Sequence, residues 1–219
     1  MKKLIAIIAM LGLGLATFAQ ENTTAASNDE IKAVFGQGNK MKIGWFIEGS
    51  GGYTKFCSTD IGLAGISGGI IINHNFSIGL TASGVANSQQ ITYKNFIEGK
   101  DARLEAGWGG LRIEYTLFPK SPVHVTFPLM IGGGQVSYIS TDESYDPVSN
   151  KWECSHEVLA SDGIFVVEPG VKAEVNIFRF MRLGAGISYR YTPDLDLPNT
   201  STDFINNFTV GGSIKFGKF

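Results

Sequence analysis

The sequence predicts an all-β protein: one closed antiparallel transmembrane β-barrel of eight strands. Apolar and polar residues alternate through most of the chain after residue 40, and short connections alternate with long ones. In addition, one parity of most of these alternating segments is free of charge. No long apolar segment follows the first 19 residues. A membrane-spanning chain of this kind must therefore be a closed barrel, because only helices and closed barrels satisfy all backbone hydrogen bonds in hydrocarbon.

Residues 1–19 have the layout of a secretory signal peptide. Lys2 and Lys3 give a positive start, residues 4–15 form an apolar stretch, and residues 16–19 supply small residues before the expected cleavage point. The apolar stretch is shorter than the roughly 20 residues that a transmembrane helix needs. We therefore expect export and cleavage, without a lipoprotein anchor because no Cys stands directly after the cleavage point.

The remaining chain is expected to consist of a periplasmic N-terminal extension over residues 20–40 and one barrel domain over 41–219. Removing Lys2 and Lys3 lowers the number of Lys and Arg residues from 18 to 16, against 20 Asp and Glu, a formal charge of −4. This balance gives no reason to expect nucleic-acid binding. The 28 Gly residues among 219 suit a tight barrel, where bare backbone relieves crowding.

Eight strands account for the alternating segments, and turn signals separate them. The expected strands run over residues 41–53, 61–73, 76–88, 104–118, 123–138, 163–177, 181–192 and 204–218.

The connections between these strands alternate in length. Outer-membrane barrels have short periplasmic turns and longer extracellular loops, so we expect the short turns and both chain ends on the periplasmic side. The short turns are 74–75, 119–122 and 178–180, and the larger connections are 54–60, 89–103, 139–162 and 193–203.

In seven of the eight strands, the central positions of one parity, 40 in all, carry no charged residue, although the chain is 17% charged. These positions are the alternate residues of 41–49, 76–86, 109–117, 123–133, 165–177, 181–191 and 208–216. Lys or Arg at mid-bilayer costs about 2–4 kcal/mol, so this uncharged parity is expected to meet lipid. A soluble lipocalin-like barrel would instead put its apolar face inside. The second strand is apolar on both parities. Pro128 and Pro169 fall inside strands, where Pro removes a ladder donor; each is expected at a bulge that reverses the parity beyond it.

The opposite parity is rich in Gly, Ser and Thr and carries charges of both signs, as the narrow interior of an eight-stranded barrel allows. Buried charges are costly unless they are paired. We therefore predict an ion-pair network that fills the lumen as a rigid plug, with a narrow selective pore as the alternative. Its members are Glu48, Arg112, Glu114, Glu168, Lys172, Glu174, Arg182, Arg190 and Lys215.

The two cysteines, Cys57 and Cys154, both fall in expected outer loops. In an oxidising compartment such a pair can form a disulfide, so a loop-to-loop bridge and two free thiols both remain open. No cofactor is expected, and no metal, because too few ligands gather in the sequence.

The last strand has apolar residues at alternate positions, and the terminal Phe219 lies on the other parity. In this strand and in the layout of 41–219, the chain resembles the small outer-membrane β-barrel families: the OmpA/OmpX-like and related "outer membrane protein beta-barrel domain" proteins. The resemblance implies a Gram-negative outer-membrane location and a C-terminal signal read by the barrel-assembly machinery. Either Phe216 is the effective terminal aromatic or the last residues curl. The signal residues are Phe208, Val210, Ile214, Phe216 and Phe219.

One sequence of possible catalytic residues, Ser155-His156-Glu157, lies in the 139–162 segment. Some lipid-modifying outer-membrane barrels use a Ser, a His and a carboxylate. However, adjacent residues of an extended segment point to alternate sides, and catalysis needs side chains that converge. We therefore expect a solvated loop and no enzyme.

The leading hypothesis is a non-enzymatic integral outer-membrane barrel with a packed polar lumen. Its large loops would bind an extracellular or envelope protein or stabilise the envelope, and its outer face would contact membrane lipid and lipopolysaccharide. A narrow porin-like pore for small solutes is the first alternative. An outer-membrane lipid-modifying enzyme is the second.

Overall fold

A computed structural model describes residues 42–57, 59–87, 92–97, 100–146, 151–193 and 195–219. The expected signal peptide and N-terminal extension, residues 1–19 and 20–40, lie outside these ranges. Within the described ranges, the chain contains no helix of the length and apolar character needed to cross a membrane.

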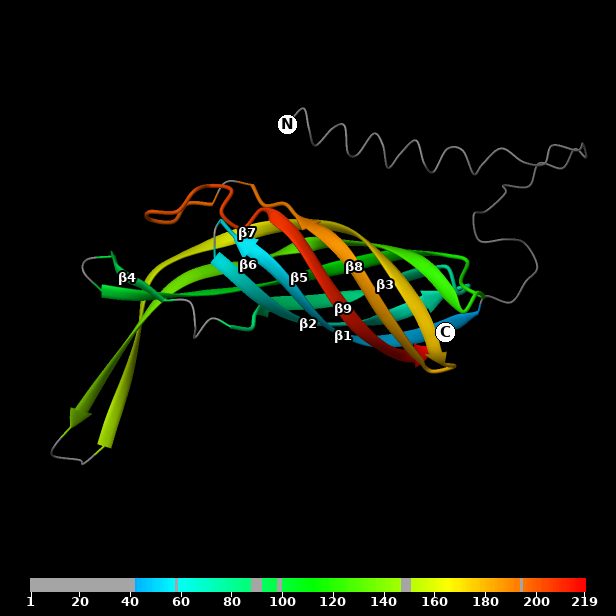
Figure 1. Ribbon diagram of the computed structural model, residues 1–219, viewed down its shortest axis with the longest axis horizontal. Coiled ribbons are helices and arrows are strands. Elements are labelled where there is room, and N and C mark those ends of the chain that lie inside the picture. The colour runs from blue at the N-terminus through cyan, green and yellow to red at the C-terminus, as the bar shows by residue number, and fades with distance from the viewer. Residues whose placement is uncertain (1–41, 58, 88–91, 98–99, 147–150, 194) are drawn as a thin grey trace, which may run out of the picture. The chain divides into compact units, whose positions relative to one another are not determined.

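Eight antiparallel strands close into a ring in the order β1-β2-β3-β5-β6-β7-β8-β9, and β9 pairs with β1 to complete it (Figure 1). A further strand, β4, pairs with the start of β5. The predicted fold class, a closed antiparallel barrel of eight strands, is confirmed. The strands are β1 (Ile43–Phe56), β2 (Thr59–Ile72), β3 (Phe76–Val85), β4 (Thr92–Ile97), β5 (Lys100–Leu117), β6 (Val123–Asp146), β7 (Lys151–Phe178), β8 (Met181–Arg190) and β9 (Asn207–Lys218).

The turns between β2 and β3, between β5 and β6 and between β7 and β8 lie at one end of the barrel, together with the C-terminus (Figure 1). The turn between β2 and β3 uses Asn73 and His74 with positive φ angles of 51° and 65°, which Asn and His adopt more readily than most residues. We call this end the short-turn end and the opposite one the loop end.

At the loop end, the structure corrects the predicted connections. Residues 54–60 do not form a medium loop, because β1 and β2 stay paired up to Phe56 and Thr59. Residues 139–162 do not form a long loop either. β6 and β7 continue as a paired ribbon out to Asp146 and Lys151, and Figure 1 shows this ribbon projecting beyond the other strands. Its polar sequence lacks the alternation of apolar and polar residues by which strands are recognised.

Within the expected 89–103 loop, the structure adds β4. Its backbone pairs with β5 at Tyr93 and Ala102, and the rings of Tyr93 and Phe96 pack against the aromatic ring of Tyr138 at 6.0 and 4.6 Å between centroids. This short strand is fixed by contacts with residues distant in the sequence, which a local pattern does not reveal.

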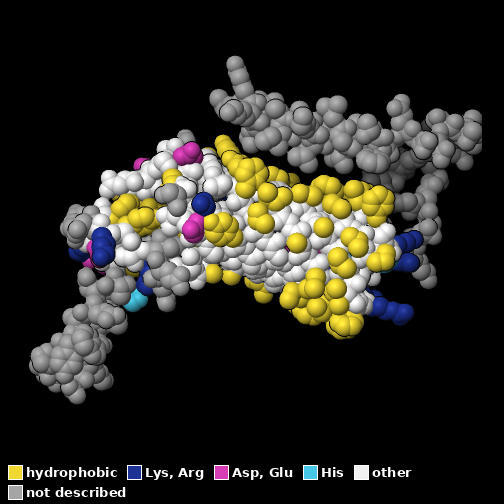
Figure 2. All heavy atoms as spheres, in the orientation of Figure 1, with side chains coloured by type: hydrophobic (Ala, Val, Ile, Leu, Met, Phe, Trp, Pro, Cys, Tyr) yellow, Lys and Arg dark blue, Asp and Glu magenta, His cyan; other side chains and the backbone are white. Residues whose placement is uncertain are grey.

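The predicted lipid-facing parity points away from the lumen. Large apolar side chains such as Trp45, Leu80 and Val175 are exposed, and Figure 2 shows apolar side chains spread over the middle of the barrel, with charged groups toward its ends. The doubly apolar β2 is explained by its position: Ile66 and Ile70 face outward, whereas its alternate apolar residues face the interior.

The expected bulges at Pro128 and Pro169 do not form. The pairs Thr126–Lys172 and Leu129–Pro169 share one register, and the shift in the β6–β7 pairing falls instead at Tyr138. Pro is compatible with extended backbone and removes only its own donor. The outward parity therefore continues past both prolines.

Candidate functional site

The charged interior is built from alternate residues of five strands, because successive side chains of a strand point to opposite faces. The structure brings seven of the nine predicted charged residues into one buried cluster nearer the short-turn end, which we call the charged layer. Its members are Glu48 of β1, Arg112 and Glu114 of β5, Lys172 and Glu174 of β7, Arg182 of β8 and Lys215 of β9.

Lys215 lies at the centre of this layer. Its Nζ atom is 3.2 Å from Glu48, 2.6 Å from Glu114 and 2.7 Å from Glu174. A second ammonium, that of Lys172, is 2.8 Å from Glu48 and 2.7 Å from Glu174. The three carboxylates offer oxygens within 4.8 Å of one another, a spacing that could hold a metal ion. In this chain the two lysine side chains provide the positive charge there.

Arg112 joins the layer to the barrel wall. Its guanidinium donates to Glu48 at 3.1 Å, to Glu114 at 2.6 Å and to the hydroxyl of Ser67 at 3.0 Å. Arg112 and Glu114 are two residues apart on β5, so they share the inward face.

Two further residues cover the layer at the short-turn end. His124 Nε2 lies 3.1 Å from Glu174, its direct pairing partner on β7. The ring centroid of Phe219 lies 3.6 Å from the guanidinium carbon of Arg182. The sequence pattern did not identify the partner of His124, because the pairing depends on the β6–β7 register. Phe219, predicted as part of the assembly signal, covers an interior cation, whereas Phe216 faces outward.

Glu168 and Arg190 form a separate pair closer to the loop end. Arg190 Nε is 3.4 Å from Glu168, and Ser188 donates to Glu168 at 2.6 Å. The Arg190 guanidinium carbon lies 4.1 Å from the ring centroid of Trp108. Glu168 was expected to join Lys172 in one network, but its partner is Arg190, which faces it from β8.

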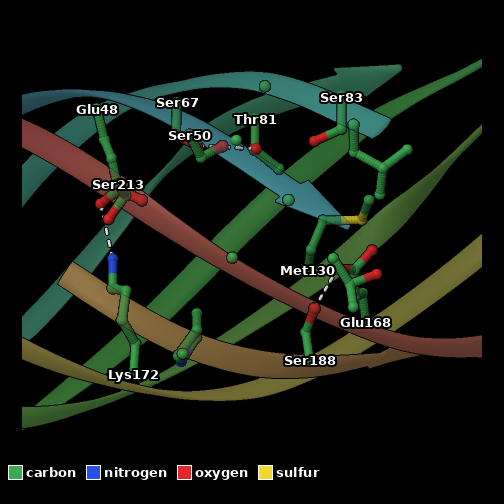
Figure 3. A pocket seen from close by; sticks show the side chains of 18 of the residues that line it. Glu48, Ser50, Ser67, Thr81, Ser83, Met130, Glu168, Lys172, Ser188 and Ser213 are labelled. Atoms are coloured by element: carbon green, nitrogen blue, oxygen red, sulfur yellow. Dashed lines mark hydrogen bonds and ion pairs between the residues drawn. The ribbon is translucent and has the colours of Figure 1, made fainter. Parts of the chain in front are cut away.

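A cavity of about 160 Å³ lies beside the charged layer. Several small hydroxyl side chains line its wall, as Figure 3 shows for Ser50, Ser67, Thr81, Ser83 and Ser213. Glu48 and Lys172 border it and are joined by an ion pair in the same view, while Ser188 binds Glu168 across from them. The backbones of β5 and β6 approach closely nearby: a Cβ at Gly110 would collide with the carbonyl of Ile131.

Toward the loop end, a cluster of buried apolar side chains packs beside the Glu168–Arg190 pair, so the expectation of a polar lumen throughout is corrected. We call this cluster the apolar layer. The segment between β8 and β9 folds over it: Phe204 packs on Phe56 at 5.6 Å between ring centroids, and Thr200 hydrogen-bonds Tyr138 at 2.9 Å. Its buried members are Phe56, Ile61, Leu63, Ala102, Leu104, Ala106, Trp108, Met130, Val136, Tyr138, Ile164, Val166, Leu195, Leu197, Phe204 and Ile205.

The remaining candidate residues lie on β7. Ser155, His156 and Glu157 are consecutive in the extended β7, and the Glu157 carboxylate binds Lys100 at 2.5 Å. The side chain of Ser155 lies outside those that the structure describes.

Cys57 is a free, exposed cysteine with Sγ 3.7 Å from the Ser201 hydroxyl. The possible disulfide with Cys154, whose side chain is outside the described set, is therefore not formed in this structure. The outward residues of the expected assembly signal, Phe208, Val210, Ile214 and Phe216, are all exposed on β9.

No protein-family model matches the sequence, and no curated protein matches it. Among solved structures, the chain is similar to a major outer membrane protein from Thermus thermophilus. The TM-score is 0.51 at 11% identity, covering 80% of this chain and 99% of that one.

Two further structures are similar at lower scores. Neisserial surface protein A has a TM-score of 0.45 at 14% identity, covering 83% of this chain and 100% of that one. Ail, the attachment invasion locus protein of Yersinia pestis, has a TM-score of 0.44 at 9% identity, covering 80% and 98%. At such identities the comparisons concern the fold, and the Thermus structure shows it to be that of an outer-membrane β-barrel.

Proposed function

We propose that this chain is an integral, non-enzymatic outer-membrane protein with a closed lumen, which displays the β6–β7 ribbon outside the cell to contact a partner or support the envelope. One observation carries the proposal: side chains fill the lumen in two successive layers, one charged and one apolar. The apolar outer surface supports residence in a bilayer.

The charged layer argues against a pore. Each of the three central carboxylates, Glu48, Glu114 and Glu174, has at least two cationic partners within 4.0 Å. Removing one member of such a buried set typically costs about 3–5 kcal/mol because the remaining charge is left uncompensated. An ion passing through would have to displace these contacts and then the apolar layer.

The ribbon is the feature best placed to meet a partner. Its strands remain paired from Ser140 and Glu157 out to Asp146 and Lys151. The ion pair of Lys100 with Glu157 links its base to β5. Short turns face the periplasm in barrels of this class, so the ribbon would stand on the extracellular side.

Planar-bilayer recording of the purified protein tests the closed lumen. We expect no discrete conductance steps in insertions verified by heat-modifiable gel mobility and by resistance to carbonate extraction. Reproducible steps would favour the pore alternative. Unchanged lipid A mass spectra after deletion of the gene are expected of a non-enzymatic protein, whereas a shift in acyl composition would favour the enzyme alternative.

A further inference from the structure

Exposed basic side chains surround the short-turn end of the barrel. Lys42 precedes β1, Lys120 and Arg179 lie in two of the short turns, and Lys218 ends β9. All four are exposed, and none has an ion-pair partner among the described residues. Figure 2 shows dark blue side chains projecting from this end, beyond the apolar belt. We call these four residues the basic collar.

Exposed aromatic rings lie next to the collar. Phe118 is 69% exposed, and Phe178 and Phe180 stack on each other at 5.6 Å between centroids while remaining largely exposed. Trp45, also exposed, pairs directly with Lys218 across β1 and β9. Aromatic side chains concentrate where hydrocarbon meets head groups, so this position puts the basic collar at the depth of lipid phosphates.

The two ends of the barrel differ in charge. At the loop end, two of the basic side chains are paired with acids: Lys55 lies 3.5 Å from Asp60, and Lys100 binds Glu157. At the short-turn end, no acidic side chain occurs in the segments that carry or adjoin the collar, which are 42–45, 73–75, 118–122, 179–180 and 217–219.

We infer that the basic collar binds the phosphate groups of anionic phospholipids in the inner leaflet and enriches those lipids around the barrel. The inference rests on the proposed outer-membrane location. Unpaired cations at the head-group level attract anionic lipid, and the attraction falls off within a Debye length. The adjoining rings would hold the collar at this depth.

Trp45 provides a local reporter of this enrichment. Lys42 lies three residues before it on the chain and Lys218 is its pairing partner. The other two tryptophans are Trp108, which is buried in the lumen, and Trp152, which is replaced by Phe in every variant. The full chain is reconstituted in vesicles of phosphatidylcholine with 20 mol% phosphatidylglycerol, roughly the charge of a natural leaflet. Bromine atoms on the lipid chains quench tryptophan fluorescence. In one set of vesicles the phosphatidylglycerol is brominated, and in the other an equal fraction of the phosphatidylcholine is brominated instead.

The ratio of the two quenching efficiencies measures enrichment at Trp45. We expect the brominated phosphatidylglycerol to quench Trp45 about twice as efficiently as the brominated phosphatidylcholine, and high salt to reduce this ratio. The Lys42→Gln/Lys218→Gln variant should bring the ratio to about one, whereas the matched Lys55→Gln/Lys94→Gln variant at the loop end should leave it unchanged.

A quenching ratio of one for the protein with the intact basic collar would overturn the inference. An equal decrease of the ratio in both double variants would overturn it as well. Failure of the protein to float with the vesicles in heat-modifiable form is a different result. It would contradict the proposed membrane location itself, and the inference with it.

Discussion

The charged and apolar layers close the same lumen by different means. In the charged layer, Lys215 and Lys172 hold three carboxylates, and each group depends on partners from several strands. In the apolar layer, the segment between β8 and β9 contributes Leu195 and Ile205 to a cluster of close-packed side chains. The charged layer therefore depends on the balance of its charges, whereas the apolar layer depends on how completely its side chains fill the lumen. They should therefore fail under different substitutions.

The largest effect is expected at the centre of the charged layer. Lys215→Met removes the cation shared by three buried carboxylates and should lower the free energy of unfolding by about 3–5 kcal/mol. Denaturant unfolding in lipid vesicles measures this loss. The exposed Lys218→Met is the matched control on the same strand and should change stability by no more than about 0.5 kcal/mol. Equal effects of the two variants would mean that the charged layer does not hold the barrel together.

A smaller loss is expected in the apolar layer. Leu104 is fully buried there, and Leu104→Ala should cost about 2–5 kcal/mol through lost transfer energy and a cavity. The exposed ribbon residue Val158, changed to Ala, is the control. Because the charged layer stays intact, the Leu104 variant should still show no conductance steps. Steps in this variant would mean that the apolar layer alone closes the lumen.

The smallest effect is expected at Cys57, in the turn between β1 and β2. Its thiol is free and exposed, so Cys57→Ser should change the free energy of unfolding by no more than about 0.5 kcal/mol, with or without reductant. A loss of about 2–4 kcal/mol, abolished by reductant, would indicate that a disulfide with Cys154 forms in the oxidised protein. The loop end would then be closed covalently as well as by packing.

The sequence alone predicted the ring of strands, because lipid on one side and a packed interior on the other impose a period of two. It also singled out nine charged residues that the structure places inside the barrel, since inward charges stand out against an uncharged outer parity. It did not reveal which charges pair. Glu48 and Lys172 are far apart in the chain and meet only when the ring closes. The apolar layer was not foreseen because inward apolar residues such as Val136 resemble lipid-facing ones.

The most direct test of the closed lumen is the accessibility of the cavity between the two layers. Ser213 lines this cavity on β9. A Ser213→Cys variant lacking Cys57 and Cys154 is reconstituted in vesicles and treated from both sides with a charged thiol reagent that does not cross lipid. Because reaction requires local opening, the cavity thiol should react at least about a hundredfold more slowly than a Lys218→Cys thiol at the exposed end of the same strand. Comparable rates would contradict the account, because an aqueous path would then reach the centre of the barrel.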